Sequence, residues 1–401
     1  MQQEINNSMQ YIGFNAHLLD RKKNGNLLEL QVGNEYRKDK LNSDLSFLND
    51  ENVLDRPAAY QNDMKYQVND LYLKSSYRHK IRNIALSGKL NFHQLFNNLD
   101  NQKESTQQNP FYMHPSIGLE WEINNRNSLT SNYSYTTTNA KTLDLYSNYV
   151  LTSYNTFAKG TAEFNQLTAS NFFIIYKFGN WSDRFFANAF INYSKNHDFY
   201  SNNSQIQQNY TQSEKIKIKD RQTLFLNISL DYYLRSLATN IKIDLGTNIS
   251  EYKNVVNEEL RKIDSQNYTY GIELRSSLPG FFNYHLGTKW NTSVINTNQS
   301  LSNTNQVSFL DLFFKINDAF DIQVQSEQYY FGGLETDKSY YFLDFGISHK
   351  LLKNKLNLGV TGKNLFNTKK FRDYKITDIN TSTTEYRLLP RLVLLSLEFR
   401  F

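Results

Sequence analysis

Apolar and polar residues alternate along this chain from its first residues to its last. The clearest example follows Arg391: one face of an extended strand would carry Val393, Leu395, Leu397, Phe399 and Phe401, and the other Leu392, Leu394, Ser396, Glu398 and Arg400. A repeat of two residues is typical of a β-strand with two different faces, and helical spacing is rarely sustained here. The alternation therefore predicts an all-β fold.

We expect about 17 such strands, joined by connections of two kinds. Short turns are expected near 24–25, 124–127, 180–183, 279–280, 317–318 and 352–354, and long polar loops near 38–63, 97–112, 141–162, 200–214, 253–266, 296–303 and 367–385. Short turns on one rim and long loops on the other are typical of outer-membrane β-barrels, whose long loops lie outside the cell.

Composition narrows the choice of environment. The 401 residues include 28 Tyr and 28 Phe, far more aromatics than a disordered chain carries. No stretch of about 18 apolar residues exists, so no transmembrane helix is expected, but a barrel strand needs only ~9–11 residues with one apolar face. Hydrocarbon offers the backbone no hydrogen-bond partner, so the strands would have to pair and close. We therefore expect a transmembrane antiparallel β-barrel.

A soluble β-sandwich is the main alternative, because its strands also alternate. Strands of ten or more residues, two classes of connection and only five prolines favour the membrane barrel. In a barrel, aromatics near strand ends would lie at the headgroups, and the candidates are Trp181, Tyr329, Tyr330, Tyr340 and Tyr341. Charged residues would face the water-filled lumen. We assign to that face Glu120, Glu122, Glu273, Arg275, Glu398 and Arg400. We favour the interpretation that they are ordinary polar residues of the lumen over the interpretation that they contact a plug or a ligand.

Two C-terminal segments resemble a known family. The run from Gly359 to Asn367, with its Lys363, Asn364, Leu365, Phe366 and Asn367, looks like the penultimate strand of TonB-dependent receptors. The run from Leu389 to Phe401, entered through Pro390 and Arg391, looks like their final strand. This motif-level resemblance covers roughly the last 45 residues.

The resemblance implies a 22-stranded barrel around an N-terminal plug that contacts TonB. It implies uptake of a scarce ligand such as a siderophore, cobalamin or an oligosaccharide. It also implies that the aromatic residues Phe399 and Phe401 belong to the signal that the barrel-assembly machinery reads. The barrel would contact outer-membrane lipid, and a small ligand of unknown identity would be its cargo.

The sequence departs from that family because it shows neither a plug-like region nor a secretory leader. We therefore expect residues 1–401 to be the C-terminal portion of a longer receptor, with the plug and first strands absent. TonB would then be reached only through a plug domain outside this chain. A passive outer-membrane channel, or a smaller barrel of about 17 strands, is the alternative interpretation.

Motifs for catalysis or cofactor binding are missing. The chain has no cysteine, its seven histidines lie on different hairpins without a close metal-ligand pair, and neither a phosphate loop nor a Gly-x-Ser-x-Gly elbow is present. The net charge of +5 is spread along the chain, so no nucleic-acid partner is expected. We expect no enzyme activity, cofactor or metal. Tyr146, Tyr149 and Tyr154 could stack on a ligand ring, but self-packing of their loop is the favoured interpretation.

Overall fold

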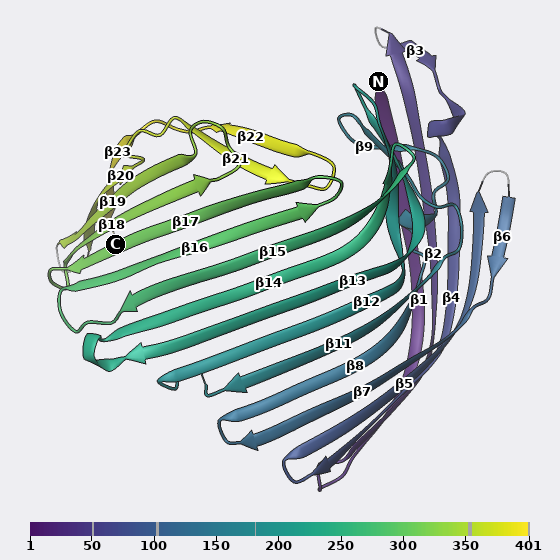
Figure 1. The fold of residues 1–401 in the computed structure, drawn as a ribbon, viewed down its shortest axis with the longest axis horizontal. Helices are drawn as coiled ribbons and strands as arrows, with labels where there is room; N and C mark the ends of the chain where they lie inside the picture. The colour runs from purple at the N-terminus through teal and green to yellow at the C-terminus, as the bar shows by residue number, and fades with distance from the viewer. Residues whose placement is uncertain (50–51, 102–103, 181, 352–354, 400–401) are drawn as a thin grey trace. The chain divides into compact units, whose positions relative to one another are not determined.

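The computed structural model describes residues 1–49, 52–101, 104–180, 182–351 and 355–399. Within these residues 23 strands form, and six of them are short pieces inside connections. The remaining 17 are long and pair almost entirely in antiparallel fashion, which confirms the predicted all-β class and strand number. Figure 1 shows β15 to β20 one after another in chain order.

The bounds of the long strands are β1 (Gln2–Arg21), β2 (Leu27–Asn49), β4 (Asn62–Ile81), β5 (Ile84–Asn101), β7 (Phe111–Asn124), β8 (Asn127–Asn139), β11 (Gln166–Phe178), β12 (Phe185–Ile206), β13 (Thr211–Leu234), β14 (Thr239–Val256), β15 (Glu259–Ser276), β16 (Phe282–Asn296), β17 (Ser300–Lys315), β18 (Phe320–Phe331), β19 (Ser339–Leu351), β20 (Leu356–Lys363) and β23 (Leu392–Phe399). The short elements are β3 (Asn52–Asp55), η1 (Ala58–Tyr60), β6 (Glu104–Gln108), α1 (Thr142–Leu145), β9 (Val150–Ser153), β10 (Thr156–Lys159), η2 (Arg235–Leu237), β21 (Lys370–Ile376) and β22 (Thr381–Arg387).

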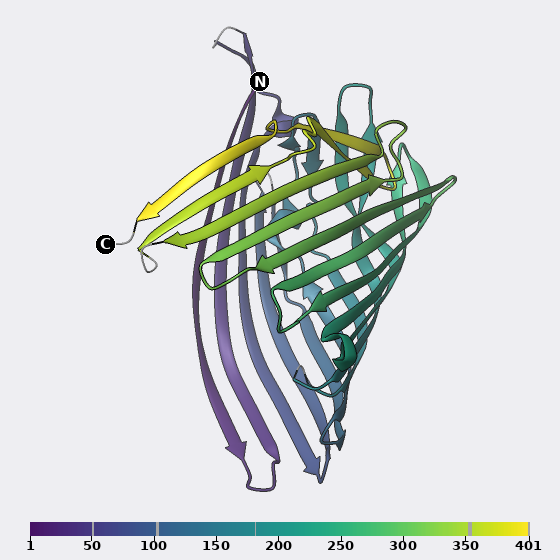
Figure 2. The same cartoon turned by 90° about the vertical axis from the view of Figure 1, so that its left-hand side faces the viewer.

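The chain forms two compact units. Unit 1 comprises residues 1–174, 192–223 and 251–263, and unit 2 comprises 175–191, 224–250 and 264–401. In unit 1, β1, β2, β4, β5, β7 and β8 follow one another as antiparallel neighbours. Figure 2 shows β1 and β2 side by side along nearly their whole length. In unit 2, β15 through β20 and then β23 are paired in the same way.

Strands extend further into the polar stretches than the sequence predicts. Three of the expected long loops are wrong: β12 and β13 are separated only by residues 207–210, β14 and β15 by Asn257 and Glu258, and β16 and β17 by residues 297–299. Asn257 and Glu258 have φ values of 48° and 70°, as a tight primed hairpin turn requires. Main-chain pairing needs no apolar side chain, so strands polar on both faces lose the alternation but keep the ladder.

One face of unit 1 is covered by the connection between β8 and β11, residues 140–165. This connection contributes Ala140, Leu145 and Tyr146 to a buried cluster. The strands contribute Leu41 from β2, Met64 and Tyr66 from β4, and Leu99 from β5. Leu41 pairs directly with Met64, so these side chains share one face, which we call the covered face.

The opposite face of unit 1, the bare face, exposes large apolar side chains. Along β7, every second residue from Phe111 to Ile123 is apolar except for a proline, and Ile117 is 63% exposed. Other exposed members of the bare face are Ile12, Phe14, Leu18, Val32, Leu71, Leu73, Leu86 and Tyr133. A soluble protein rarely leaves such a continuous apolar surface open to water.

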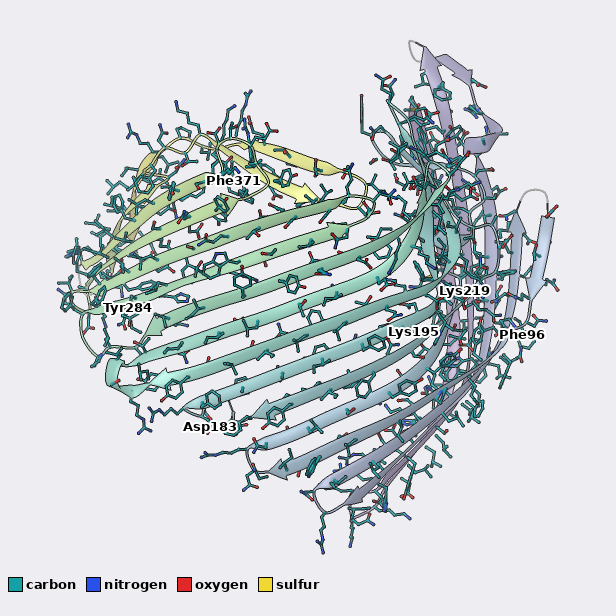
Figure 3. The ribbon with its side chains drawn as sticks, viewed as in Figure 1. Phe96, Asp183, Lys195, Lys219, Tyr284 and Phe371 are labelled. Atoms are coloured by element: carbon teal, nitrogen blue, oxygen red, sulfur yellow. The ribbon has the colours of Figure 1, made fainter. Side chains whose placement is uncertain are left out.

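Unit 2 has the same two faces. The β21–β22 hairpin lies in the long connection between β20 and β23 and packs on one of them through Phe371. Its partners are Tyr329 and Phe331 of β18 and Tyr340 and Phe342 of β19. Figure 3 labels Phe371 among these elements. The strand residues Tyr329 and Tyr340 pair directly, which places them together on the covered face of unit 2.

Substitution of Leu145 by alanine tests whether the 140–165 connection is held by its apolar core. Leu145 is fully buried, whereas Leu143 in the same short helix is 61% exposed. We expect Leu145→Ala to lower the free energy of unfolding by about 2–5 kcal/mol, because it leaves a cavity, and Leu143→Ala to change it little. Denaturant titration in detergent measures both, and equal losses would contradict the assignment.

Candidate functional site

The covered face of unit 1 contains a cavity of about 460 Å³. Strands β1, β2, β4, β5, β7 and β8 supply its wall, and the first residues of the covering connection, Ala140 to Thr142, close one side. The wall combines aromatic and ionisable groups, among them Tyr11, Glu35, Arg37, Tyr66, Asp70, His93, Tyr112 and His114. Cavities of this size that combine apolar walls with a few polar groups are the usual place for a small ligand.

Most ionisable groups around the cavity already have partners. Arg37 Nε lies 2.7 Å from Asp39, and His93 Nδ1 lies 2.9 Å from Asp70. The carboxylate of Glu35 lies close to two tyrosine hydroxyls, those of Tyr11 and Tyr72. These pairings fix the side chains of the wall, as a preformed binding site requires.

Glycine makes room for one of those tyrosines. A Cβ added at Gly33 would lie 2.5 Å from the Tyr72 hydroxyl oxygen, which is closer than real carbon atoms approach. Gly33 pairs directly with Tyr72 across β2 and β4. The missing side chain therefore lets the Tyr72 ring lie over the neighbouring strand and reach Glu35.

Paired polar contacts hold the covering connection in place. Thr142 Oγ1 donates to Asp39 at 2.8 Å. The amide of Gln3 donates to the Leu151 carbonyl at 2.8 Å and accepts from the Leu151 N–H at 2.7 Å. Lys215 Nζ lies 2.7 Å from Asp144, whose other carboxylate oxygen accepts the Lys141 N–H at 2.9 Å. The connection is therefore anchored both by its apolar cluster and at its polar edges.

The three loop tyrosines have different surroundings. Tyr146 is buried in the cluster, where burial and then Asp144 raise the pKa of its hydroxyl. Tyr149 packs against Tyr60 with ring centroids 5.9 Å apart. Tyr154, between β9 and β10, is 95% exposed. Tyr146 and Tyr149 thus pack within the protein, against strand residues and against Tyr60 of another connection, while Tyr154 is exposed.

The charged lumen candidates of unit 2 share a face. Glu273 and Arg275 lie two residues apart on β15, and Arg275 pairs with His285 of β16. The His285 ring lies between two carboxylates, with Nε2 3.6 Å from Glu273 and Nδ1 3.8 Å from Asp311. Their face is the covered one, because direct pairing continues from Asp311 across β18 and β19.

The other lumen candidates fall in several places. Glu120 and Glu122 lie on the covered face of β7, and Arg78 of β4 lies 2.5 Å from Glu120. Glu398 of β23 pairs with Asn357 of β20. Arg400 and Phe401 lie outside the described residues. Phe399 is exposed on the bare face of β23 and pairs with Leu356.

The two C-terminal motifs contact each other directly. The side-chain amide of Asn364 donates to the Thr368 and Leu389 carbonyls, both at 2.9 Å. The side-chain oxygen of Asn367 accepts the Arg391 N–H, the residue after Pro390, at 3.2 Å. Lys363 pairs with Asp344 at 2.7 Å, and the Asn364 N–H donates to the same carboxylate. Leu365 continues the ladder by donating to the Leu343 carbonyl at 2.9 Å.

Backbone geometry explains why the motif uses asparagine. Asn364 and Asn367 have φ values of 50° and 56°, in the left-handed region. Asparagine tolerates this conformation better than most residues and supplies the hydrogen bonds as well. The two asparagines thus join the end of β20 to the start of β23, and we call this arrangement the asparagine clasp.

The prediction that Tyr329 and Tyr340 belong to an outward-facing aromatic girdle is wrong. Tyr330 and Tyr341 have the parity of the bare face, and Phe366 of the motif lies beside Tyr341 at a small surface cavity and is 57% exposed. Tyr329 and Tyr340 instead face the β21–β22 hairpin. Adjacent tyrosines on one strand must point to opposite faces, so both members of a pair cannot reach the same interface. Trp181 lies outside the described residues.

None of the helices in the described part of the chain has the length and the apolar run that a membrane crossing needs. No group of three or more His, Cys, Asp or Glu side chains is arranged there to hold a metal ion. The sequence could not reveal the wall residues Asp70, His93 and Tyr72 as neighbours, because only strand register brings them together.

No known family profile and no curated protein matches the sequence. Solved structures do match. The copper transporter OprC is 10% identical, with 99% of this chain and 67% of that chain covered and a TM-score of 0.49. The ferric yersiniabactin uptake receptor FyuA from Yersinia pestis is 9% identical, with 94% and 61% covered and a TM-score of 0.43. BauA, the ferric preacinetobactin receptor from Acinetobacter baumannii, is 10% identical, with 98% and 63% covered and a TM-score of 0.43.

The chain thus spans about two thirds of the length of these proteins. At these identities and TM-scores, the assignment of function depends on the chain's own residues.

Substitution at Asn364 tests the asparagine clasp. We expect Asn364→Ala to lower the free energy of unfolding by roughly 1–3 kcal/mol, because it removes side-chain hydrogen bonds and places a Cβ-bearing residue in the left-handed region. Asn364→Gly tolerates the left-handed backbone, so it should lose only the part of the free energy of unfolding that the side-chain hydrogen bonds contribute. Hydrogen exchange at residues 388–391 should accelerate in both, and unchanged exchange there would contradict the clasp.

The docking of the β21–β22 hairpin should depend on pH. Hydrogen bonds from Arg372 and then Lys370 hold the pKa of Glu385 below its ordinary value of 4.5. The folded state therefore binds the proton less tightly, so the pairing stabilises the hairpin above that value and is lost as pH falls through the lowered pKa.

Hydrogen exchange in residues 370–387, corrected for intrinsic rates, should therefore speed up between about pH 5 and pH 3. Glu385→Gln should remove this response. Asp318→Asn is the matched control, because it changes an exposed carboxyl with a lowered pKa in a different turn. A pH response that survives Glu385→Gln would contradict the assignment.

Proposed function

We propose that this chain is the barrel portion of an outer-membrane receptor that resembles TonB-dependent receptors and takes up a scarce small ligand. The bare face is the surface toward lipid, and the covered face is the lumen. The chain would be the C-terminal part of that barrel, and contact with TonB would require a plug domain.

The division of the bare face along each strand carries this proposal. On β1, the bare-face residues from Gln2 to Gln10 are polar, and those from Ile12 to Leu18 are apolar. On β2, Leu28, Leu30 and Val32 are apolar, and Lys38 and Lys40 are charged. Direct pairing of Leu18 with Leu30 sets the apolar parts side by side, next to the short turn. An exposed apolar band that is bounded by polar residues is what the hydrocarbon layer of a bilayer requires of a barrel strand. The core of a soluble protein does not require such a band.

The strands continue well beyond that band. β2 has 23 residues and β13 has 24, about twice what a bilayer crossing requires. The excess lies on the side of the long connections, which in such barrels is the outside of the cell. In unit 1, the anchored connection 140–165 packs on Leu41 in this part of β2, as a segment that meets an incoming ligand would.

A receptor fits the covered face better than an open passive channel does. The wall of unit 1 holds a formed cavity with fixed side chains, and connections in both units pack onto this face. A pore for rapid passive flow gains nothing from such immobilised segments, whereas a binding protein does. The same proposal includes assembly by the barrel-assembly machinery. The exposed aromatic residue Phe399 at the end of β23 supports this part of it.

A charged residue in the apolar band tests the membrane assignment. Ile117 lies midway along the bare face of β7, and Ile117→Arg should destabilise the inserted barrel by about 2–4 kcal/mol. Ser8→Arg, in the polar part of the bare face of β1, should change stability by less than about 0.5 kcal/mol. Reversible unfolding in lipid vesicles measures both free energies.

Heat-modifiable migration on a detergent gel should show a folded barrel for the unsubstituted chain. A chain that is monodisperse in buffer without detergent would overturn the membrane assignment. Steady conductance in planar bilayers by a complete receptor that includes a plug would favour the passive channel instead.

A further inference from the structure

Two histidines from neighbouring strands meet in the wall of the unit 1 cavity. His93 belongs to β5 and His114 to β7, and His93 pairs directly with Tyr112, two residues before His114. The two imidazole centroids are 5.2 Å apart, with an angle of 37° between the ring planes. The histidines are far apart in sequence, so spacing along the chain could not identify them as a pair.

The two imidazoles are held in different ways. His93 Nδ1 lies 2.9 Å from Asp70 Oδ2, so a neutral His93 donates its Nδ1–H to that carboxylate and carries a lone pair on Nε2. The His114 ring stacks on Tyr112, with ring centroids 6.0 Å apart, and its Nε2 makes no hydrogen bond. A neutral His114 with its hydrogen on Nδ1 carries a lone pair on Nε2 as well.

Neither Nε2 atom is satisfied by the described protein. His114 Nε2 is buried without any hydrogen-bond partner. The contacts of His93 within the described residues are the Asp70 carboxylate and the rings of Tyr72 and His114, which leave its Nε2 without a donor. Buried nitrogens without a partner are uncommon. An unpartnered lone pair in a cavity wall indicates that a hydrogen-bond donor or a metal ion binds there.

We propose that His93 and His114 bind a first-row divalent transition metal ion through their Nε2 atoms. Neutral imidazole is a preferred ligand of Zn²⁺, Cu²⁺ and Ni²⁺. A carboxylate at the other nitrogen, as Asp70 provides for His93, is a usual orienting partner of a metal-binding histidine. The described residues contain no cluster of three such ligands, so water or a molecule in the cavity completes the coordination.

The site depends only on the folded wall of unit 1. It therefore stands or falls independently of the uptake function proposed above, and heat-modifiable migration reports folding separately from metal binding.

Copper(II) is the probe of choice, because imidazole sites bind it most tightly among these ions and its spectrum counts nitrogen ligands. The untagged 401-residue chain, folded in detergent, is titrated with Cu²⁺ and followed by electron paramagnetic resonance. We expect one ion per chain, with hyperfine splitting from two imidazole nitrogens. A spectrum with fewer than two imidazole nitrogens would overturn the site, and this measurement needs no substitution.

Variants assign the ligands. His93→Ala and His114→Ala should each weaken Cu²⁺ binding by more than about 100-fold, and Asp70→Asn by about 10–100-fold, because Asp70 acts through His93. His79→Ala is the matched control, since His79 stacks on Tyr77 on the opposite face of β4, and should leave the affinity unchanged. Equal affinity in a folded His93→Ala/His114→Ala double variant would refute the proposal.

Discussion

Main-chain hydrogen bonding between antiparallel strands is the constraint on which the rest of this structure depends. It fixes register residue by residue, and with a period of two it sends neighbouring side chains to opposite faces. The consequence extends over long distances: Gly13, Glu35 and Asp70 share one face of β1, β2 and β4 because each pairs directly with the next. A slip by one residue on any strand would exchange the apolar and polar faces, so the ladder specifies the environment of every side chain.

The ladder alone does not stabilise the connections, and small apolar clusters do this instead. In unit 1 the segment 140–165 buries Leu145 and Tyr146 against strand residues, and in unit 2 the β21–β22 hairpin buries Phe371 against four aromatic rings. Both clusters use the covered face. In unit 1 this face also holds the cavity, so one surface serves both the packing of the connection and the candidate binding site.

The sequence was informative where side-chain chemistry differs between the faces. Alternation from Val393 to Phe399 identified β23 and both its faces, and the same signal gave the number of long strands. It failed from Lys253 to Gln266, where polar residues on both faces hid a tight hairpin. It also could not place Tyr329 and Tyr340, because a pair of tyrosines is consistent with either parity and only a distant Phe371 decides which ring is covered.

Sites assembled across strands were beyond the reach of sequence spacing, and the cavity of unit 1 shows the physical reason. Tyr72 reaches Glu35 because Gly33, on the neighbouring strand, lacks a side chain. His93 of β5 is oriented by Asp70 of β4 and faces His114 of β7. Residues from three strands therefore set the orientation and the surroundings of this one ring. The asparagine clasp follows the same logic: the Asn364 and Leu389 segments looked like separate motifs, yet a hydrogen bond joins them. In a fold built from hairpins, the local sequence specifies each strand, but register specifies the chemistry.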